Sequence, residues 1–359
     1  MDDDQRRMDR LSRAENQRRT RARVLDAARA EFTECGYRDA KIDAIADRAG
    51  LTRGGVYSNF PGKRALYFAV LAEDAGRPPL PPSTPPGRTA REALGVFARG
   101  WLARLPLMAD EPHSPARLGA DLLPEVLADE RTRVLYVQLM RLSAVLLGRS
   151  LELLHPPAGR RVGVAGSVLT QLHGASQLAA VGWGFVEEFT VVAACERLAG
   201  LDPERPWLPP HLAHTPRARP TDEPWAPPTV HDAIRDEPWS PGDGIVTVVG
   251  LHRLAMIEEA VRSAPAGTPV TAVLVTGAPD ELSNLARLVL ADLLACLRPA
   301  FPPAAWPDVR LVHDPAGELA AAAGVAAVSD ATEAAIRLRA GRIVARAEGF
   351  GAGHAAASA

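Results

Sequence analysis

The 359-residue chain contains little cysteine and almost no lysine. Its three cysteines, Cys35, Cys195 and Cys296, are far apart, and none belongs to a Cys-x-x-Cys pair or to a Cys/His metal-binding pattern. A disulfide framework or a metal site therefore has no support, and we expect buried thiols and no cofactor. The sequence also lacks a Gly-x-Ser-x-Gly nucleophile elbow and a phosphate-binding glycine loop. We assign no catalytic residue and expect no enzyme activity.

The N-terminus, Met1-Asp2-Asp3-Asp4, is acidic and no apolar segment follows it, unlike a signal peptide. We see no apolar run long enough to cross a membrane. With 47% hydrophobic residues and a net charge of -2, the composition is that of a globular protein, which we expect to be cytoplasmic and without a membrane partner.

Positive charge is concentrated near the N-terminus. Residues 16–64 contain eleven Arg or Lys and six Asp or Glu, although the whole chain is slightly acidic. Such a surplus suits a phosphate-binding face, because neutralising DNA phosphates releases counterions. Without a motif, a merely solvated basic helix would explain it equally well.

Residues 41–63 supply that motif, since they have the pattern of a helix-turn-helix. The apolar positions at helical spacing are Ile42, Ile45, Ala46 and Ala49. Gly50 follows where a helix can end in a left-handed conformation, and Thr52 is a typical N-cap for a short second helix. That helix would hold Val56 and Phe60 inward. Its outward side chains, the predicted recognition surface, are Arg53, Tyr57, Ser58 and Asn59.

This stretch and the helix before it resemble the TetR/AcrR family of bacterial transcriptional regulators. The matching positions are Thr20-Arg21, Val24-Leu25, Ala27-Ala28, Phe32, Gly36-Tyr37, Ile45-Ala46, Ala49-Gly50-Leu51, Val56-Tyr57, Phe60, Lys63 and Leu66. Ala40-Lys41 departs from the family's usual threonine or serine pair, and Gly54-Gly55 makes the recognition helix rich in glycine. The resemblance implies a double-stranded DNA operator as partner. The implied DNA-binding residues are Lys41, Thr52, Arg53, Gly54, Gly55, Tyr57, Ser58, Asn59 and Lys63.

The chain divides at proline-rich segments. The expected order is a flexible arm (1–15), the DNA-binding domain (16–75), a spacer (76–88), a helical domain (89–200), a Pro/Trp-rich linker (201–243), an α/β domain (244–350) and a tail (351–359). The linker carries three tryptophans, which are costly to expose, so we expect part of it to lie along a folded surface.

Within 89–200 we predict five helices, near 89–105, 116–128, 130–154, 161–182 and 185–199. By resemblance they form the TetR-type ligand-binding and dimerisation domain, so a small-molecule effector and a homodimer are expected. Low relief from Gly166, Gly174, Ala175 and Ala179 suits a helix–helix contact, either within one chain or across the dimer. Candidate ligand-binding residues are Trp101, Met108, His113, Tyr136, Met140, His173 and Gln177, with Trp183 nearby.

From residue 244 short branched apolar runs alternate with helical segments in the order βαβαβαββ. The stretch 313–320, continued through Gly324-Val325 and 341–344, resembles a thioredoxin-like domain. Leu251-His252-Arg253-Leu254 stands where redox members carry their cysteines, and Thr332 stands at the usual cis-proline. We expect a redox-silent domain that folds independently, so that truncation after about residue 200 leaves a soluble dimer.

The predicted fold class is therefore an all-α, TetR-like DNA-binding and regulatory part followed by an α/β thioredoxin-like domain. The favoured function is a DNA-binding transcriptional regulator, a repressor released by a small-molecule effector. The alternative is a thioredoxin-like redox or peroxide-handling enzyme with a fused helix-turn-helix.

Overall fold

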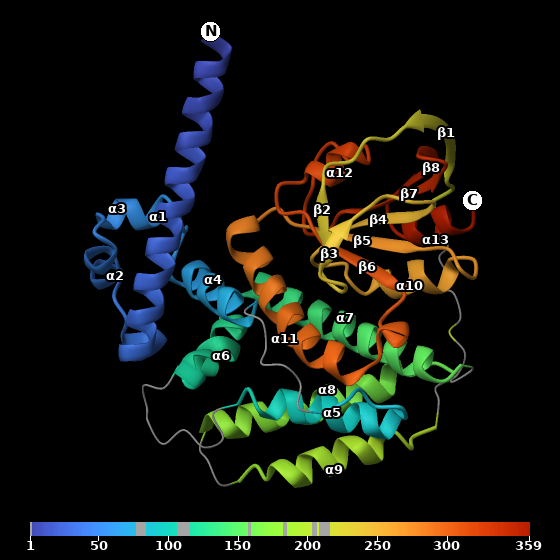
Figure 1. The fold of residues 1–359 in the computed structure, drawn as a ribbon, viewed down its shortest axis with the longest axis horizontal. Coiled ribbons are helices and arrows are strands. Elements are labelled where there is room, and N and C mark those ends of the chain that lie inside the picture. The colour runs from blue at the N-terminus through green and yellow to red at the C-terminus, as the bar shows by residue number, and fades with distance from the viewer. Residues whose placement is uncertain are drawn as a thin grey trace.

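The computed structural model describes residues 2–76, 84–105, 115–156, 159–181, 185–202, 207 and 216–359. Within these residues the chain forms a helical part, residues 2–202, and an α/β part, residues 216–359. Figure 1 shows the two parts in contact, with helix α11 of the α/β part next to helices of the helical part.

Four helices form the N-terminal region: α1 (Asp2–Asp39), α2 (Ile42–Ala49), α3 (Arg53–Tyr57) and α4 (Lys63–Ala75). The predicted flexible arm is wrong, because α1 already begins at Asp2 and its N-terminal half extends away from the other helices (Figure 1). Gly36 interrupts α1 with φ 73 and ψ 166, which fits its predicted role as the end of the first helix.

The remaining helices of this part are α5 (Ala90–Leu102), α6 (Leu122–Leu127), α7 (Glu130–Leu154), α8 (Val162–Val181) and α9 (Glu188–Leu198). They correspond to the five predicted segments, except that the second begins as a 3-10 turn, η1 (Pro115–Asp121). Thr89 caps α5 through a reciprocal capping box with Glu92. Of the predicted spacer (76–88), the structure describes Gly76 and residues 84–88. In the latter stretch, Gly87 N–H donates a hydrogen bond to Ala300 O at the end of α11 (3.0 Å).

The α/β part contains a six-stranded sheet in the order β1-β8-β7-β4-β5-β6. Its strands from residue 244 onward are β4 (Gly244–Gly250), β5 (Val270–Val275), β6 (Val309–His313), β7 (Glu333–Arg339) and β8 (Arg342–Glu348). β4, β5 and β6 are parallel, whereas β7 is antiparallel to β4 and β8 is antiparallel to β7. With α10 (Met256–Ser263), α11 (Asn284–Ala300) and α12 (Glu318–Ala322) between strands, the predicted βαβαβαββ order and the α/β class are confirmed.

Two boundaries of this part are wrong in the prediction. The segment 201–243 contains β1 (Arg219–Pro224), which pairs with β8, and a hairpin of β2 (Val230–Asp232) and β3 (Glu237–Trp239). The expected tail contains α13 (Ala352–Ala357), which is buried. The sequence pattern does not reveal either element. Proline in β1 argues against a strand because it lacks an amide donor, and a run of alanines in α13 shows no alternation of polar and apolar residues that would predict a helix. As expected, part of the linker is ordered: Trp239 is buried and Trp225 Nε1 donates to Ala322 O (2.9 Å).

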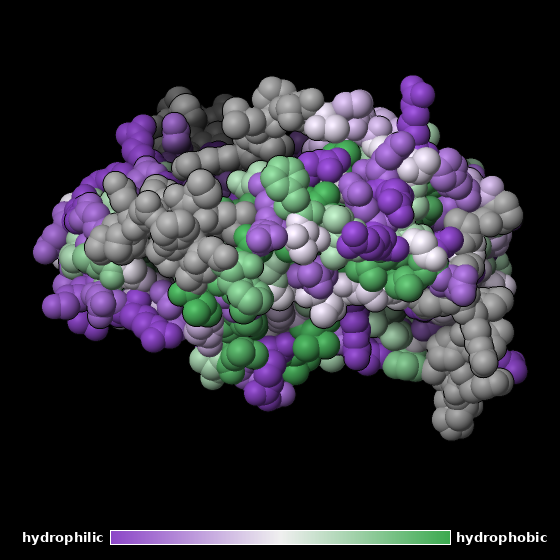
Figure 2. Space-filling model, turned by 90° about the horizontal axis from the view of Figure 1, so that it is seen from below, coloured by the Kyte–Doolittle hydropathy of each residue, from purple (hydrophilic) through white to green (hydrophobic). Residues whose placement is uncertain are grey.

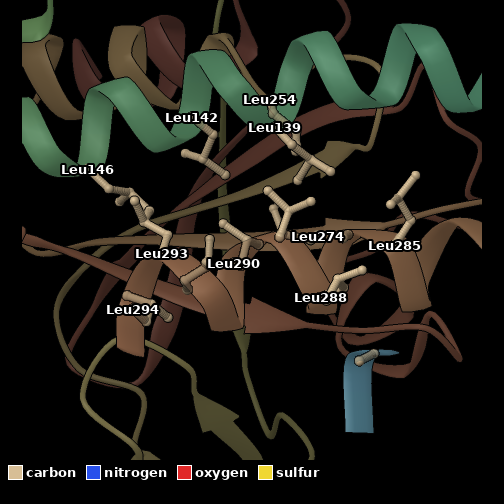
Figure 3. Close-up of a cluster of buried hydrophobic side chains, with 14 of the residues drawn as sticks. Leu139, Leu142, Leu146, Leu254, Leu274, Leu285, Leu288, Leu290, Leu293 and Leu294 are labelled. Atoms are coloured by element: carbon tan, nitrogen blue, oxygen red, sulfur yellow. The ribbon is translucent and has the colours of Figure 1, made fainter. Parts of the chain in front are cut away.

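Helix α11 joins the two parts into one hydrophobic core. Leu139, Leu142 and Leu146 of α7 face leucines of α11 (Figure 3). The labelled α11 leucines are Leu285, Leu288, Leu290, Leu293 and Leu294. α11 also packs along α4 and α5. The prediction of a separately tethered α/β domain is therefore wrong, because its longest helix is apolar on several faces and is buried by both parts.

Among the residues that the structure describes, α7 is the one helix long and apolar enough to cross a membrane by length and composition. This corrects the expectation that no such run exists. Most of the helix is buried in the core, where a continuous apolar surface is needed on more than one side.

Candidate DNA-binding and ligand-binding sites

The turn between α2 and α3 forms as the sequence predicts. Ile45 and Ala49 are buried on the inner face of α2, and Gly50 ends the helix with φ 63 and ψ 41. Thr52 Oγ1 accepts a hydrogen bond from Gly55 N–H (3.1 Å), which caps α3. Val56, buried on α3, completes the packing. The local geometry of a helix-turn-helix is thus complete.

The exposed face of α3 carries Arg53 and Tyr57. The Arg53 guanidinium lies 3.3 Å from Asp43 Oδ2 and 5.6 Å from the centre of the Tyr57 ring. Both partners are exposed, so these contacts orient the arginine at little energetic cost and leave it able to exchange them for DNA. Gly54 lies beside Arg53 and adds no side chain, so backbone and arginine can approach a ligand together.

Ser58 and Asn59 have a different role in the structure. The Ser58 hydroxyl and the Asn59 amide each donate to Gly55 O at 2.9 Å, which stabilises the end of α3. The half-buried Asn59 is also tied to α1, since Arg21 Nη1 donates to Asn59 O (2.7 Å). Arg21 stacks over the Phe60 ring at 4.1 Å. Sequence reasoning used Arg21 only as a family marker, yet it braces the recognition helix.

The two lysines of the chain, Lys41 and Lys63, differ in exposure and in hydrogen bonding. Lys41 is exposed, and no side-chain hydrogen bond caps α2 at this residue. Lys63 Nζ donates to Arg38 O (3.0 Å) and lies 4.8 Å from the Tyr37 ring. Partial burial lowers the pKa of Lys63. Lys63 thus caps the end of α1, whereas Lys41 presents its charge to solvent.

A cavity of about 490 Å³ lies between α4, α5, α8 and α11. Its aliphatic lining includes Leu71, Leu105, Leu118, Leu122, Leu288 and Val289. Four predicted ligand-binding residues line it as well: Trp101, Tyr136, His173 and Gln177. Met140, one turn beyond Tyr136 on α7, is not among its lining residues and instead packs partly buried against the core. Met108, His113 and Trp183 lie outside the described residues.

The polar groups of the cavity converge on His173. The Tyr136 hydroxyl lies 3.4 Å from His173 Nδ1, and the Trp101 ring meets the imidazole edge-on with centroids 4.9 Å apart. Trp101 Nε1 donates to Ser176 Oγ (2.9 Å). His173 Nε2 is buried and has no hydrogen-bond partner among the described residues. Burial lowers the pKa of His173 to about 4, so the imidazole is neutral near pH 7.

We expect His173 to make stability depend on pH. Its pKa is about 4 in the folded protein against an ordinary value of 6.5, so between these values the unfolded chain binds a proton that the folded chain does not. The contribution of His173 to stability therefore falls by about 3 kcal/mol as pH drops from about 6.5 to 4. Urea unfolding at several pH values should show a shallower fall for His173→Gln than for the wild type. Parallel curves for the wild type and His173→Gln would contradict this assignment. Burial also lowers the pKa of His313 in β6 to about 4, so His313→Gln should make the fall shallower as well.

The α/β part completes the cavity. Leu288, Val289 and Asp292 of α11 form one wall, and Asp292 pairs with Arg104 after α5. Sequence reasoning missed this wall, although it predicted the helix. The leucines of α11 had the appearance of ordinary core, and the charge of Asp292 alone did not distinguish a cavity wall from a solvent-facing side.

Apolar side chains are exposed at the end of α8 and the start of α9. Val181 is 88% and Phe189 is 89% exposed, and Leu178 and Phe185 are exposed beside them. Figure 2 views the molecule from the side where these helices lie and shows apolar patches among polar side chains. Gly166 and Gly174 have open space beside them, whereas Ala175 and Ala179 are buried inward, as the alternative of a helix–helix contact within one chain expects.

The end of β4, where a redox site was considered, is covered by the helical part. His252 Nε2 donates to Arg131 O (3.2 Å), and Arg131 pairs with Asp330 at 2.8 Å. Burial raises the pKa of the Cys296 thiol to about 12. In the described part of the chain no cluster of His, Cys, Asp or Glu could hold a metal ion.

The helix-turn-helix geometry places residues 24–70 in a known class of DNA-binding domain: they match the family of bacterial regulatory proteins, tetR family. The HTH-type transcriptional regulator SrpR of Pseudomonas putida is 42% identical over 96 residues, 27% of this chain and 41% of that protein. The uncharacterised HTH-type transcriptional regulator TtgW, also of Pseudomonas putida, is 42% identical over 96 residues, 27% of this chain and 65% of its own. The chain thus covers less than two thirds of these relatives.

A crystal structure described as a TetR-family transcriptional regulator from Mesorhizobium loti aligns over 51% of this chain and 94% of its own, with 14% identity and a TM-score of 0.26. At that score it carries no argument about the fold. The tetR-type character of the N-terminal domain is carried by the sequence matches, and these concern the DNA-binding region.

Proposed function

We propose that this protein is a TetR-type transcriptional regulator that binds an operator as a homodimer and is a repressor released by a small-molecule effector. One observation carries the proposal: the tetR-family helix-turn-helix presents exposed Arg53 and Tyr57 on a capped recognition helix. The test is a gel shift with DNA from upstream of its own gene against scrambled DNA. Binding that does not distinguish the two would contradict an operator-specific regulator.

The homodimer is supported by the exposed patch of Leu178, Val181, Phe185 and Phe189, because such a patch on α8 and α9 is costly to leave in water. Two recognition helices related by a two-fold axis would read two half-sites. Sedimentation of the full chain should give twice the monomer mass. A monomer at micromolar concentration would remove this part of the proposal.

Arg53 should read a base, since arginine paired with guanine is the commonest specific major-groove contact. Arg53→Ala is expected to lower the discrimination between operator and scrambled DNA by roughly 1 to 3 kcal/mol. Arg38→Ala is the matched control, because it removes the same charge from an exposed side chain of α1. Equal loss on both DNAs would show that Arg53 contacts only phosphate.

The proposed DNA contacts also include Lys41, Thr52, Gly54, Gly55, Tyr57 and Lys63, with Ser58 and Asn59 mainly shaping the helix end.

Release by an effector requires reciprocal coupling between the two sites. DNA must weaken effector binding by the same factor by which the effector weakens DNA binding. The cavity beside α4 suits this, because α4 follows the recognition helix directly and its last turn forms part of the cavity wall.

We further propose that the α/β part is a thioredoxin-like module without redox activity. Strands β5, β4, β7 and β8 lie side by side with one parallel and two antiparallel pairings, which supports the resemblance. A redox site needs a thiolate, and the Cys296 thiol is buried with a raised pKa. The purified protein should reduce neither insulin nor hydrogen peroxide with a thiol donor. Turnover that disappears in Cys296→Ser would favour the enzyme alternative.

A further inference from the structure

The cavity described above is built by two parts of the chain that are far apart in sequence. α4, α5 and α8 supply one side, and α11 of the α/β part supplies the other. Arg64 in the first turn of α4 also pairs with Glu281, three residues before α11 begins, and with Asp129 at the start of α7 (3.5 Å). The cavity therefore borders both the helix that leaves the DNA-binding region and the α/β part.

The charged side chains of the cavity wall already have ion-pair partners within the protein. Asp292 pairs with Arg104, and Asp74 pairs with Arg29 at 2.9 Å. Among the lining residues that the structure describes, Asp292, Arg104 and Asp74 are the only Asp, Glu, Lys or Arg side chains, and His173 is neutral near pH 7. A charged ligand would have to break one of these pairs or be buried without a counter-ion, and either is costly.

One polar atom of the wall still lacks a partner. His173 lines the cavity, and its Nε2 is buried without a hydrogen bond while Nδ1 faces the Tyr136 hydroxyl. Leaving a buried imidazole nitrogen unpaired costs about 1 to 3 kcal/mol, which a ligand donor or acceptor would recover. Aromatic Trp101 and the surrounding leucines would cover the rest of such a ligand.

We propose that this two-part cavity binds an uncharged, largely apolar molecule with one hydrogen-bonding group placed at His173, and that α11 is an obligatory wall of the site. The inference rests on the proposed function in taking the cavity as the effector site. It adds the chemical class of the effector and gives the α/β part a role in binding it.

Two dyes with the same aromatic body test the proposal on the full chain without DNA. N-phenyl-1-naphthylamine is uncharged, and 8-anilino-1-naphthalenesulfonate adds a sulfonate. Fluorescence titration should show the uncharged dye binding at least about tenfold more tightly. Tighter or equal binding of the sulfonate would overturn the assignment to an uncharged ligand.

Asp292→Asn identifies the site without changing its shape. It leaves Arg104 without its carboxylate, so the affinity for the sulfonate should rise about tenfold while that for the uncharged dye is retained. Asp308→Asn is the matched control, because Asp308 also pairs with an arginine of the helical part, Arg149, but lies away from this cavity. If Asp292→Asn behaves like Asp308→Asn, the dyes bind elsewhere and the proposal fails.

Leu288→Trp tests the wall from the α/β part directly. The larger side chain should fill the cavity and weaken the uncharged dye by at least about tenfold, whereas Leu127→Trp on the exposed side of α6 should not. Unchanged binding in a folded Leu288→Trp protein would remove α11 from the site. If this variant does not fold, Asp292→Asn still decides. Because no DNA is used, a failed gel shift with intact dye binding would reject the regulator and keep the ligand site.

Discussion

A chain ending at residue 200 should not form a soluble folded protein. Removing the α/β part would expose α7 along the line of Leu139, Leu142 and Leu146, all fully buried under α11 (Figure 3). Burial of each leucine is worth about 1.5 to 3 kcal/mol, so these three side chains alone approach the whole stability of a typical domain, about 5 to 15 kcal/mol. α4 and α5 would lose their cover as well.

The measurement is the soluble yield and thermal melting of residues 1–200 beside the full chain. We expect aggregation of the short chain and a single cooperative transition of the full one. Residues 216–359, co-expressed as a separate chain, should restore solubility if the missing cover is the cause. A short chain that is soluble, melts cooperatively and binds operator would show that the helical part is independent after all.

This result separates what local sequence patterns predict from what they do not. The helix-turn-helix follows from neighbours in sequence: an apolar face on α2, Gly50 at its end and the Thr52 cap determine the turn. The strands β4 and β5 could also be predicted from local sequence, because strands buried in a parallel sheet consist of nearly continuous runs of branched apolar residues.

Only the side of the candidate ligand site that belongs to the helical part could be predicted from the sequence. Trp101, Tyr136 and His173 are conspicuous because aromatic and histidine side chains on mainly apolar helices suggest a pocket. Leu288 could not be distinguished from core, since burial against protein and burial against a cavity require the same residue type. Which faces of α11 meet the helical part depends on packing between segments more than a hundred residues apart, and periodicity within one helix holds no information about that.

The same limit explains why the sequence could not say which small residues of α8 face the core and which face solvent. Gly174 and Ala175 are adjacent and differ by one methyl group, yet one faces solvent and the other the core. α8 is apolar on most sides, so its pattern does not select an inner face. The exposed Phe189 on α9 indicates an interface more strongly than these small residues do, because a large apolar side chain is costly to leave in water.

Glu152 of α7 joins the two parts by charge, and its loss should be among the most destabilising single changes. Its carboxylate pairs with Arg149 of the same helix and with Arg262 of α10 (2.9 Å), and it accepts from Arg161 N–H (2.9 Å). The side chains of Glu152, Arg149 and Arg262 are only 9%, 17% and 12% exposed. Burying charges is costly, and the carboxylate compensates both arginines at once.

Glu152→Gln keeps the shape and removes the charge, so the two guanidiniums keep only their other partners, Asp308 and Glu258. We expect a loss of about 3 kcal/mol in the free energy of unfolding, the lower end for breaking a buried pair. Glu130→Gln on the same helix is the matched control. Its carboxylate is 68% exposed and pairs only with Arg133 among the described ion pairs, so little should change. Urea unfolding monitored by tryptophan fluorescence and by circular dichroism measures both variants. Equal curves for Glu152→Gln and Glu130→Gln would mean that apolar packing of α11 alone holds the parts together.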